Sequence, residues 1–319
     1  MSRSFSSNFA SDIIQMVEYK EALGYKPSSY EWDLQNFDRF CLKNYPKATV
    51  LTREIVLAWC QEGEEDRNRR SGYRAIAIRK FGKYLTAIGK DAFVLPTNWF
   101  PAPKADLPYL LTDEELSNFF SATDNYPSRA NSPLLEYIVP VIFRLQYACG
   151  MRPQEVRLLK RVDFDFKRNT IYIESSKWSR DRRLSVYPKL MALCRKYDAI
   201  AQSYFPDRIY FFPSSQRDGA YSYYWLTATF HKCWKLSGNN NSSKSCVPYS
   251  LRHNYATRTL LRWVEEGKDF NVYLPYLSHY MGHASFKSTY YYVHLLPEKL
   301  GCMDFMNRQG VIPEVSDEA

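Results

Sequence analysis

The sequence lacks paired cysteines and long hydrophobic segments. Its seven cysteines are odd in number and widely scattered, without a CxxC pair. They therefore favour neither a disulfide framework nor a thiolate metal site, and they indicate a reduced, cytoplasmic setting. No apolar run reaches the roughly 18 to 20 residues that a membrane helix needs, and the first fifteen residues have no apolar stretch typical of a secretory signal. We therefore expect a cytoplasmic protein with no membrane partner.

The charge balance is basic. Lysine and arginine total 43 against 34 aspartate and glutamate, giving a net charge of +9 and a sequence pI of about 9.0. Such an excess favours a polyanionic partner, with nucleic acid first. The 45% hydrophobic content is sufficient for folded cores, and 319 residues exceed the size at which a single core stops growing. The totals thus predict two domains and a nucleic-acid partner.

A proline-rich stretch marks the domain boundary. Four prolines between residues 96 and 108 cannot continue a helix and favour an extended linker. The following LTDEEL has Thr112 and Glu115 at the spacing of a capping box, which opens a helix. We predict a helical domain over 1–95, the linker over 96–109, a second domain of helices and a few strands over 110–296, and a C-terminal tail over 297–319.

The first domain reads as short helices, the fourth of which is basic. Ser28 and Glu31 have capping-box spacing, Thr52 begins a third helix, and the fourth is expected from about Asn68 to Ile88. A run of charges is commonly a solvated helix face. Because no acidic residue occurs between Asp66 and Asp91, we also expect phosphate contacts here. The candidate DNA-binding residues are Arg67, Arg70, Arg74, Arg79, Lys80 and Lys83.

Five short segments of the second domain carry residues suited to phosphoryl transfer through a tyrosine. Guanidinium groups match the negative charge spread over the phosphate oxygens of the transition state. The strands TIYIE and RLSVYP are expected to form a hairpin. The segments are GMRPQE with Arg152 and Glu155; the hairpin SSKWSRDRR with Lys177 and the candidate DNA contacts Arg180 and Arg182; YSLR with Tyr249 and Arg252 on one helical face; MGH with His283; and YVH with Tyr292.

Together, these segments resemble the tyrosine recombinase, or phage integrase, family of enzymes that break and rejoin DNA. The family order is G-x-R-x-x-E, a lysine on a β-hairpin, H-x-x-R, L-G-H and a terminal tyrosine followed by x-H. The resemblance covers the whole chain. It implies a mainly α fold with a small β-sheet or hairpin: an N-terminal helical-bundle (SAM-like) core-binding domain, and a mixed α/β catalytic domain.

The resemblance also implies a mechanism without metal or cofactor. Tyr292 attacks a backbone phosphate, forming a 3′-phosphotyrosyl bond and releasing a 5′-hydroxyl. Arg152 and Arg252 hold the non-bridging oxygens, and His283 donates to them. Lys177 protonates the departing oxygen as general acid, whereas Glu155 orients Arg152 or its neighbours.

The choice of nucleophile among three tyrosines and the role of Tyr249 are considered next to the family pattern. Of the consecutive Tyr290, Tyr291 and Tyr292, the distance from MGH and the YVH continuation select Tyr292, and the other two are expected to pack. Where the family most often has histidine, this chain has Tyr249. A phenol donates hydrogen bonds but is a poor base near neutral pH, so we expect a hydrogen-bonding or structural role there. His253 is expected to be a packing residue.

Three alternatives carry less weight. His279, His283 and His294 have partial zinc-site spacing, but no nearby carboxylate or thiolate completes a ligand set. A type IB topoisomerase uses similar phosphotyrosine chemistry, although the hairpin-to-tail layout fits a recombinase better. A catalytically inactive DNA-binding protein on the same fold is supported by Tyr249 alone.

The expected partners follow from the resemblance. They are double-stranded DNA with a specific recombination site, further copies of the chain in a tetramer on DNA, and accessory DNA-bending or directionality proteins. The expected role is integration or excision of a mobile element in a bacterial or phage setting. The segment after Tyr292 offers apolar residues that either dock on a neighbouring subunit or pack on their own domain: Leu295, Leu296, Leu300, Met303, Phe305 and Met306.

Overall fold

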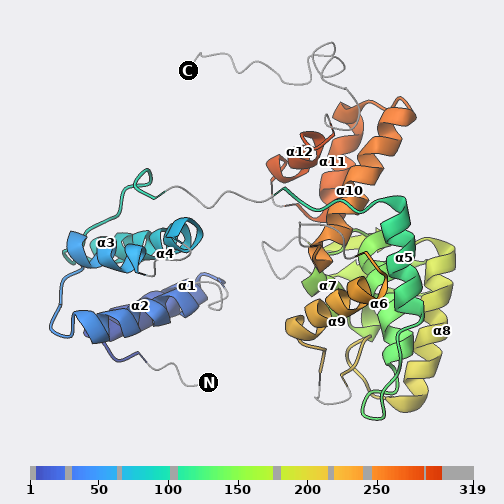
Figure 1. Ribbon diagram of the computed structural model, residues 1–319, viewed down its shortest axis with the longest axis horizontal. Helices are drawn as coiled ribbons and strands as arrows, with labels where there is room; N and C mark the ends of the chain where they lie inside the picture. Colours follow the sequence, from blue (N-terminus) through green and yellow to red (C-terminus); the bar gives the residue numbers. More distant parts are fainter. Residues whose placement is uncertain are drawn as a thin grey trace. The chain divides into compact units, whose positions relative to one another are not determined.

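The chain forms two compact units, Met1–Leu107 and Pro108–Ala319, shown in a computed structural model (Figure 1). The units are treated separately below. None of the helices in the described parts of the chain is long and apolar enough to cross a membrane. The structure describes residues 5–25, 31–62, 67–100, 107–174, 181–214, 219–239, 246–283 and 285–296, with the backbone alone for 67–70.

The first unit is built around its fourth helix. Its helices are α1 (Ala10–Ala22), α2 (Glu31–Asn44), α3 (Arg53–Gln61) and α4 (Arg67–Ala87). α4 packs against each of the other three, because apolar residues recur along it at helical spacing, including Ala75, Ile78, Phe81 and Leu85, all buried. The Thr52 side chain accepts a hydrogen bond from the Ile55 amide, which confirms the predicted helix start. Ser28 lies outside the described residues.

Two basic residues of α4 bind protein carbonyls. Arg74 donates to the carbonyls of Trp59 and Glu62 (2.8 and 2.6 Å) and pairs with the Glu62 carboxylate at 3.4 Å. Arg79 donates to the carbonyls of Leu95 and Pro96 (2.7 and 2.9 Å). These contacts use some of the N–H donors of each guanidinium within the unit, and because both residues are partly exposed, their contact with phosphates stays a prediction. Lys80 and Lys83 are exposed, whereas the side chains of Arg67 and Arg70 are outside the described part.

The second unit is mainly helical with one small sheet, which confirms the predicted fold class. Ile173 of one strand pairs with Arg182 of the next in the predicted antiparallel hairpin, and a short third strand precedes them in the order β1-β2-β3. The elements are α5 (Asp113–Asp124), α6 (Leu135–Ala148), α7 (Pro153–Arg157), η2 (Arg161–Asp163), β1 (Phe164–Asp165), β2 (Thr170–Ile173), β3 (Arg182–Ser185), α8 (Pro188–Tyr204), α9 (Tyr223–Leu236), α10 (Pro248–Glu265), α11 (Phe270–Met281) and α12 (Lys287–Val293).

This unit begins with the predicted capping box. The Glu115 amide donates to the Thr112 hydroxyl (3.2 Å), and the Thr112 amide donates to the Glu115 carboxylate (2.9 Å). Two orphan amides at the start of α5 are satisfied in this way.

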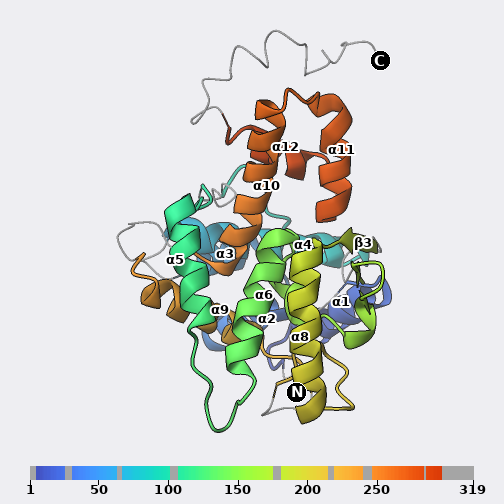
Figure 2. The same cartoon turned by 90° about the vertical axis from the view of Figure 1, so that its right-hand side faces the viewer.

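The described residues of the second unit form two hydrophobic cores. The large core gathers buried residues from α5, α6, α8, α9 and the sheet. The small core joins the distal part of α10 to α11 and α12, which lie together in the turned view (Figure 2). α10 runs from one core to the other and positions residues between them. The small core consists of Ala256, Leu260, Trp263, Phe270, Leu274, Leu277, Met281, Tyr292, Val293 and Leu296.

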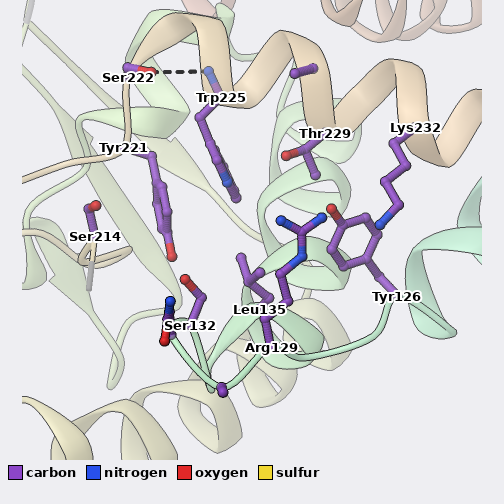
Figure 3. A pocket seen from close by; sticks show the side chains of 13 residues that line it. Tyr126, Arg129, Ser132, Leu135, Ser214, Tyr221, Ser222, Trp225, Thr229 and Lys232 are labelled. Atoms are coloured by element: carbon purple, nitrogen blue, oxygen red, sulfur yellow. Dashed lines mark hydrogen bonds between the residues drawn. The ribbon is translucent and has the colours of Figure 1, made fainter. Parts of the chain in front are cut away.

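A recess of roughly 490 Å³ opens beside the N-terminal end of α9 (Figure 3). The ring of Tyr221 stacks on Trp225 with 3.8 Å between centroids, and the Lys232 ammonium lies 4.6 Å from the ring centre of Tyr126. Ser222 caps the helix through the Trp225 amide. None of the motif residues identified from the sequence lines this recess.

Candidate active site

Arg152 lies where α6 ends and α7 begins. Gly150 allows the turn because it has a φ of +58°, and a Cβ there would lie 2.5 Å from the Tyr255 ring. The Arg152 amide donates to one oxygen of Glu155 (2.8 Å), and its guanidinium donates to the other (2.6 Å). Glu155 thus fixes both the backbone and the side chain of Arg152.

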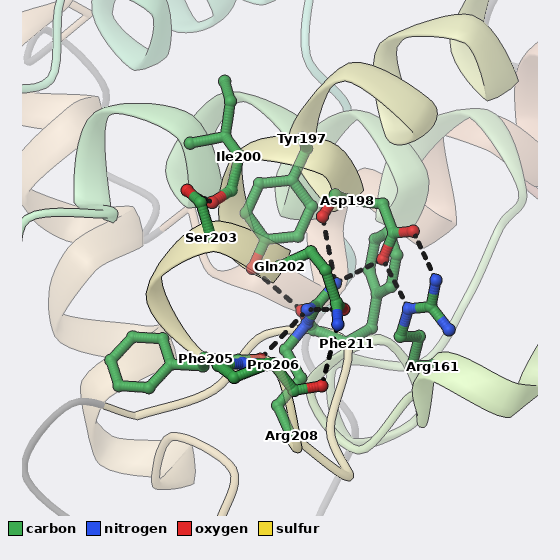
Figure 4. Close-up of polar contacts among 10 residues, drawn as sticks. All are labelled: Arg161, Tyr197, Asp198, Ile200, Gln202, Ser203, Phe205, Pro206, Arg208 and Phe211. Carbon is green, nitrogen blue, oxygen red and sulfur yellow. Dashed lines mark hydrogen bonds and ion pairs between the residues drawn. The ribbon is translucent and has the colours of Figure 1, made fainter.

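A network of hydrogen bonds and ion pairs lies beyond the C-terminal end of α7. After this helix, the Arg161 amide donates to the Ile209 carbonyl (2.9 Å). The carboxylate of Asp198 on α8 accepts from Arg161 (3.0 Å) and from Arg208 (Figure 4). The Tyr197 hydroxyl donates to the Phe211 carbonyl (2.8 Å). These bonds hold the segment that follows α7 against α8, and they thereby fix the position of the C-terminal end of α7.

Arg182 is a buried partner of Glu155. Its side chain donates to both carboxylate oxygens, at 3.0 and 2.8 Å, and the residue is 4% exposed. Burial raises the pKa of Glu155, but the hydrogen bonds and charges of Arg182 and Arg152 outweigh this effect, and the pKa is lowered overall. The predicted DNA contact by Arg182 is therefore corrected, because this guanidinium is committed to the interior.

Arg252 extends from α10 into the same region and is 0% exposed. It donates to the carbonyls of Gly150 (2.6 Å) and Met281 (2.7 Å). Its Nε is buried and has no hydrogen-bond partner among the described residues. A buried, unpartnered N–H on a cation is costly to leave unsatisfied, and it fits an arginine that receives an anion from outside the chain.

Three consecutive carbonyls at the end of α11 accept hydrogen bonds from three arginines. Arg182 Nε donates to Tyr280 (2.8 Å), Arg252 to Met281 (2.7 Å) and Arg152 to Gly282. The turn is a Schellman motif, in which the amides that follow α11 bond back to Ser278 and His279. The negative end of a helix dipole favours cations at this place.

His283 follows this turn and faces the tyrosine helix. Its Nδ1 lies 2.7 Å from the Thr289 hydroxyl, and its ring stacks near the Tyr292 ring with 6.0 Å between centroids. Burial first, and then the charges of Arg252, Arg152 and Arg182, lower the pKa of His283 to about 3. The imidazole is therefore neutral at physiological pH.

Tyr292 is the buried member of the three consecutive tyrosines. It is 3% exposed, whereas Tyr290 and Tyr291 are half-buried against the small core. Its hydroxyl lies 3.1 Å from Nδ1 of His253. Burial raises the pKa of Tyr292 to about 12, against the opposing effect of Arg252. The phenol thus holds its proton at neutral pH.

His253 was predicted to be a packing residue, and its ring does lie against those of Tyr249 and Tyr292, but its Nδ1 also contacts the Tyr292 hydroxyl. Tyr249 and His253 are four residues apart on α10, so they share a helix face, and their ring centroids lie 4.9 Å apart. That spacing was visible in the sequence; the partner on α12 was not. Lys177 and Arg180 lie outside the described residues.

Comparisons with known proteins identify relatives of this chain. The family model described as "Phage integrase family" matches residues 110–299. The integrase/recombinase y4rB of Sinorhizobium fredii is 28% identical over 302 residues, covering 92% of this chain and 94% of that protein. The tyrosine recombinase XerA of Pyrococcus horikoshii is 24% identical over 240 residues, covering 73% and 74%.

Solved structures share the fold. A XerH site-specific recombinase aligns with a TM-score of 0.65 and 17% identity, over 89% of this chain and 79% of that one. A lambda integrase aligns with a TM-score of 0.59 and 15% identity, over 86% and 77%. Their low identity means that these likenesses establish the fold alone.

Proposed function

Because this chain belongs to the phage integrase family, we propose that it is a tyrosine-type site-specific DNA recombinase whose nucleophile is Tyr292. The observation that carries the assignment of the nucleophile is the burial of its phenol beside Arg252, whose Nε has no partner among the described residues. A tyrosine next to a buried guanidinium with a spare donor suits attack on a phosphodiester.

In the proposed reaction, Tyr292 attacks the phosphorus and forms a 3′-phosphotyrosyl bond while the 5′-oxygen departs. Arg252 and Arg152 stabilise the charge on the non-bridging oxygens, and His283 donates to one of them. Lys177 protonates the 5′-oxygen as general acid. The covalent bond conserves the phosphoester energy, so a 5′-hydroxyl of another strand completes the exchange without ATP.

The partners in this proposal are double-stranded DNA and further copies of the chain. The XerH structure holds a palindromic difH substrate after cleavage, and the lambda integrase structure is a tetramer on a Holliday junction. We extend both properties to this chain, acting on a mobile element in the cytoplasm. Residues 297–319, which lie outside the described part, remain candidates for docking on a neighbouring subunit.

A suicide-substrate assay tests the proposal. Nicked duplexes from the sequences that flank the coding region are mixed with wild type, Tyr292→Phe and Tyr291→Phe, and denaturation-resistant adducts are counted. We expect adducts with wild type and Tyr291→Phe, and none with Tyr292→Phe, which still shifts the DNA in a gel. Adduct formation by Tyr292→Phe would reject the assignment. DNA binding without adducts by any variant would favour the inactive DNA-binding alternative.

Relaxation of supercoiled plasmids distinguishes a recombinase from a type IB topoisomerase. Wild type is incubated with supercoiled plasmids that either carry or lack the cleaved fragment. A recombinase exchanges strands only between plasmids that carry it, whereas a topoisomerase of this chemistry relaxes both.

A further inference from the structure

We infer that His253 is a catalytic residue that accepts the phenolic proton of Tyr292 when this tyrosine attacks DNA. The inference deepens the proposed function and rests on it. It concerns a residue outside the segments that first identified the site, and it assigns a destination to the proton that the nucleophile must lose.

The geometry places His253 against the nucleophile. His253 Nδ1 lies 3.1 Å from the Tyr292 hydroxyl oxygen, within hydrogen-bond distance. The other histidine beside this ring, His283, directs its Nδ1 to the Thr289 hydroxyl at 2.7 Å. Packing between α10 and α12 holds the pair, because both helices contribute to the small core.

The protonation states also make His253 the acceptor and Tyr292 the donor of the proton. Burial first, and then the charge of Arg252, lower the pKa of His253 to about 4, while the pKa of Tyr292 is about 12. At neutral pH the proton therefore lies on the phenol, and the neutral imidazole accepts it in a hydrogen bond. The groups that face His253 are Arg252 and Tyr249 on its own helix, and Tyr291 and Tyr292 on α12.

DNA binding changes this balance. A phosphodiester brought to Arg252 adds a negative charge that offsets the guanidinium, and a nearby anion favours the imidazolium form of His253. The acceptor therefore becomes more basic when its substrate is in place.

The proposed step exchanges one bond to phosphorus and moves two protons. The Tyr292 oxygen forms a bond to phosphorus, the bond from phosphorus to the 5′-oxygen breaks, and the phenolic proton moves to His253 Nδ1. The general acid protonates the 5′-oxygen. In the reverse direction His253 returns the proton to Tyr292 as the tyrosine leaves. Tyr249 is unsuited to this duty because a phenol does not take up a proton near neutral pH.

Substitution by asparagine separates proton acceptance from positioning. In His253→Asn the amide oxygen takes the place of Nδ1 and still accepts a hydrogen bond, but it does not take the proton. His253→Ala removes both properties. His231→Asn, at an exposed histidine of α9, is the matched control. Thermal unfolding and gel shifts on the same flanking DNA select variants that are folded and bind.

Adduct formation is then timed with ordinary DNA and with DNA that carries sulfur in place of the bridging 5′-oxygen. A thiolate leaves without protonation, so this substrate restores variants that lack the general acid but not those that lack the base. We expect His253→Asn and His253→Ala to slow adduct formation by about 10²- to 10³-fold on both substrates, and Lys177→Ala to recover on the sulfur substrate.

Either of two results would overturn the inference: a wild-type rate for His253→Asn, or recovery of this variant on the sulfur substrate. In both cases loss of the adduct in Tyr292→Phe would still uphold the proposed function. Adducts from Tyr292→Phe would instead reject the proposed function itself.

Discussion

The Nδ1 atom of His253 and the hydroxyl oxygen of Tyr292 lie 3.1 Å apart, although the two residues belong to different helices and are 39 positions apart in the chain. The partly buried His253 is thus neutral beside a tyrosine that holds its proton. The same region buries His283, Arg182 and Arg252, whereas Arg152 is partly exposed. The consequences concern stability as much as chemistry.

The stability of the second unit is expected to depend on pH below neutrality. The folded-state pKa values of His253 and His283 are lowered to about 4 and about 3, below the ordinary value of roughly 6.5. Below that value the unfolded chain binds protons that the folded chain does not. Stability is therefore complete above about pH 6.5 and falls as the pH drops toward 4, by about 1.4 kcal/mol per pH unit for each histidine.

Urea unfolding at pH values from 7.5 to 4.5 measures this dependence. His253→Asn should reduce the slope of the unfolding free energy against pH by about one proton, and the exposed His231→Asn should leave it unchanged. An unaltered slope in His253→Asn would show that this histidine is not buried in its neutral form.

Gly282 is expected to tolerate no side chain. Its φ of +64° strains any other residue, and a Cβ there would lie 2.8 Å from the Arg182 guanidinium. Gly282→Ala should lose about 1 kcal/mol from backbone strain and about 1 to 3 kcal/mol more from the clash. Gly267 has the same φ and nothing within 4 Å, so Gly267→Ala should lose only the first amount. Equal unfolding free energies for the two variants would contradict the clash.

Glu155 is expected to matter for stability through Arg182. Glu155→Gln leaves a guanidinium that is 4% exposed without its counter-charge, which typically costs about 3 to 5 kcal/mol. The control is Glu174→Gln, which breaks an exposed ion pair with Lys160 and should cost less than about 1 kcal/mol. Urea unfolding compares them, and a Glu155→Gln variant as stable as the control would show that Arg182 does not need this carboxylate.

The basic residues of α4 are expected to divide into two classes. Lys83 is exposed, so Lys83→Ala should weaken DNA binding and reduce the slope of log K against log salt by about one, without changing thermal stability. Arg79→Ala leaves the carbonyls of Leu95 and Pro96 without their donor and should lower the unfolding temperature. Fluorescence anisotropy at several salt concentrations measures DNA binding by Lys83→Ala, and thermal unfolding measures the stability of both variants. An unchanged melting temperature for Arg79→Ala would contradict its interior role.

Local signals in the sequence predicted local structure well. The capping box of Thr112 and Glu115 and the hairpin that pairs Ile173 with Arg182 depend on residues close in the chain, and their backbone patterns can be read directly. The segments that carry Arg152, Arg252, His283 and Tyr292 were also recognisable, and the structure brings these four residues together.

Burial of charge was the part that the sequence did not reveal. Arg182 and Arg183 are neighbours with the same side chain, yet strand alternation places the first inside and the second in solvent. Net charge therefore overestimated the residues available to DNA, because it counted the buried Arg182. The role of His253 depends on a contact across 39 positions, which no pattern along one helix specifies.

The separation of the two hydrophobic cores has a consequence for cooperativity. Tyr292 belongs to the small core of α10, α11 and α12, whereas Val156 of α7 belongs to the large core. Segments with their own limited core open at a lower free energy than the whole domain. Any opening that exposes Tyr292 is therefore opposed by the apolar contacts of this small core. Sequence drift in those helices can adjust how often the nucleophile is presented, without altering any group that performs the chemistry.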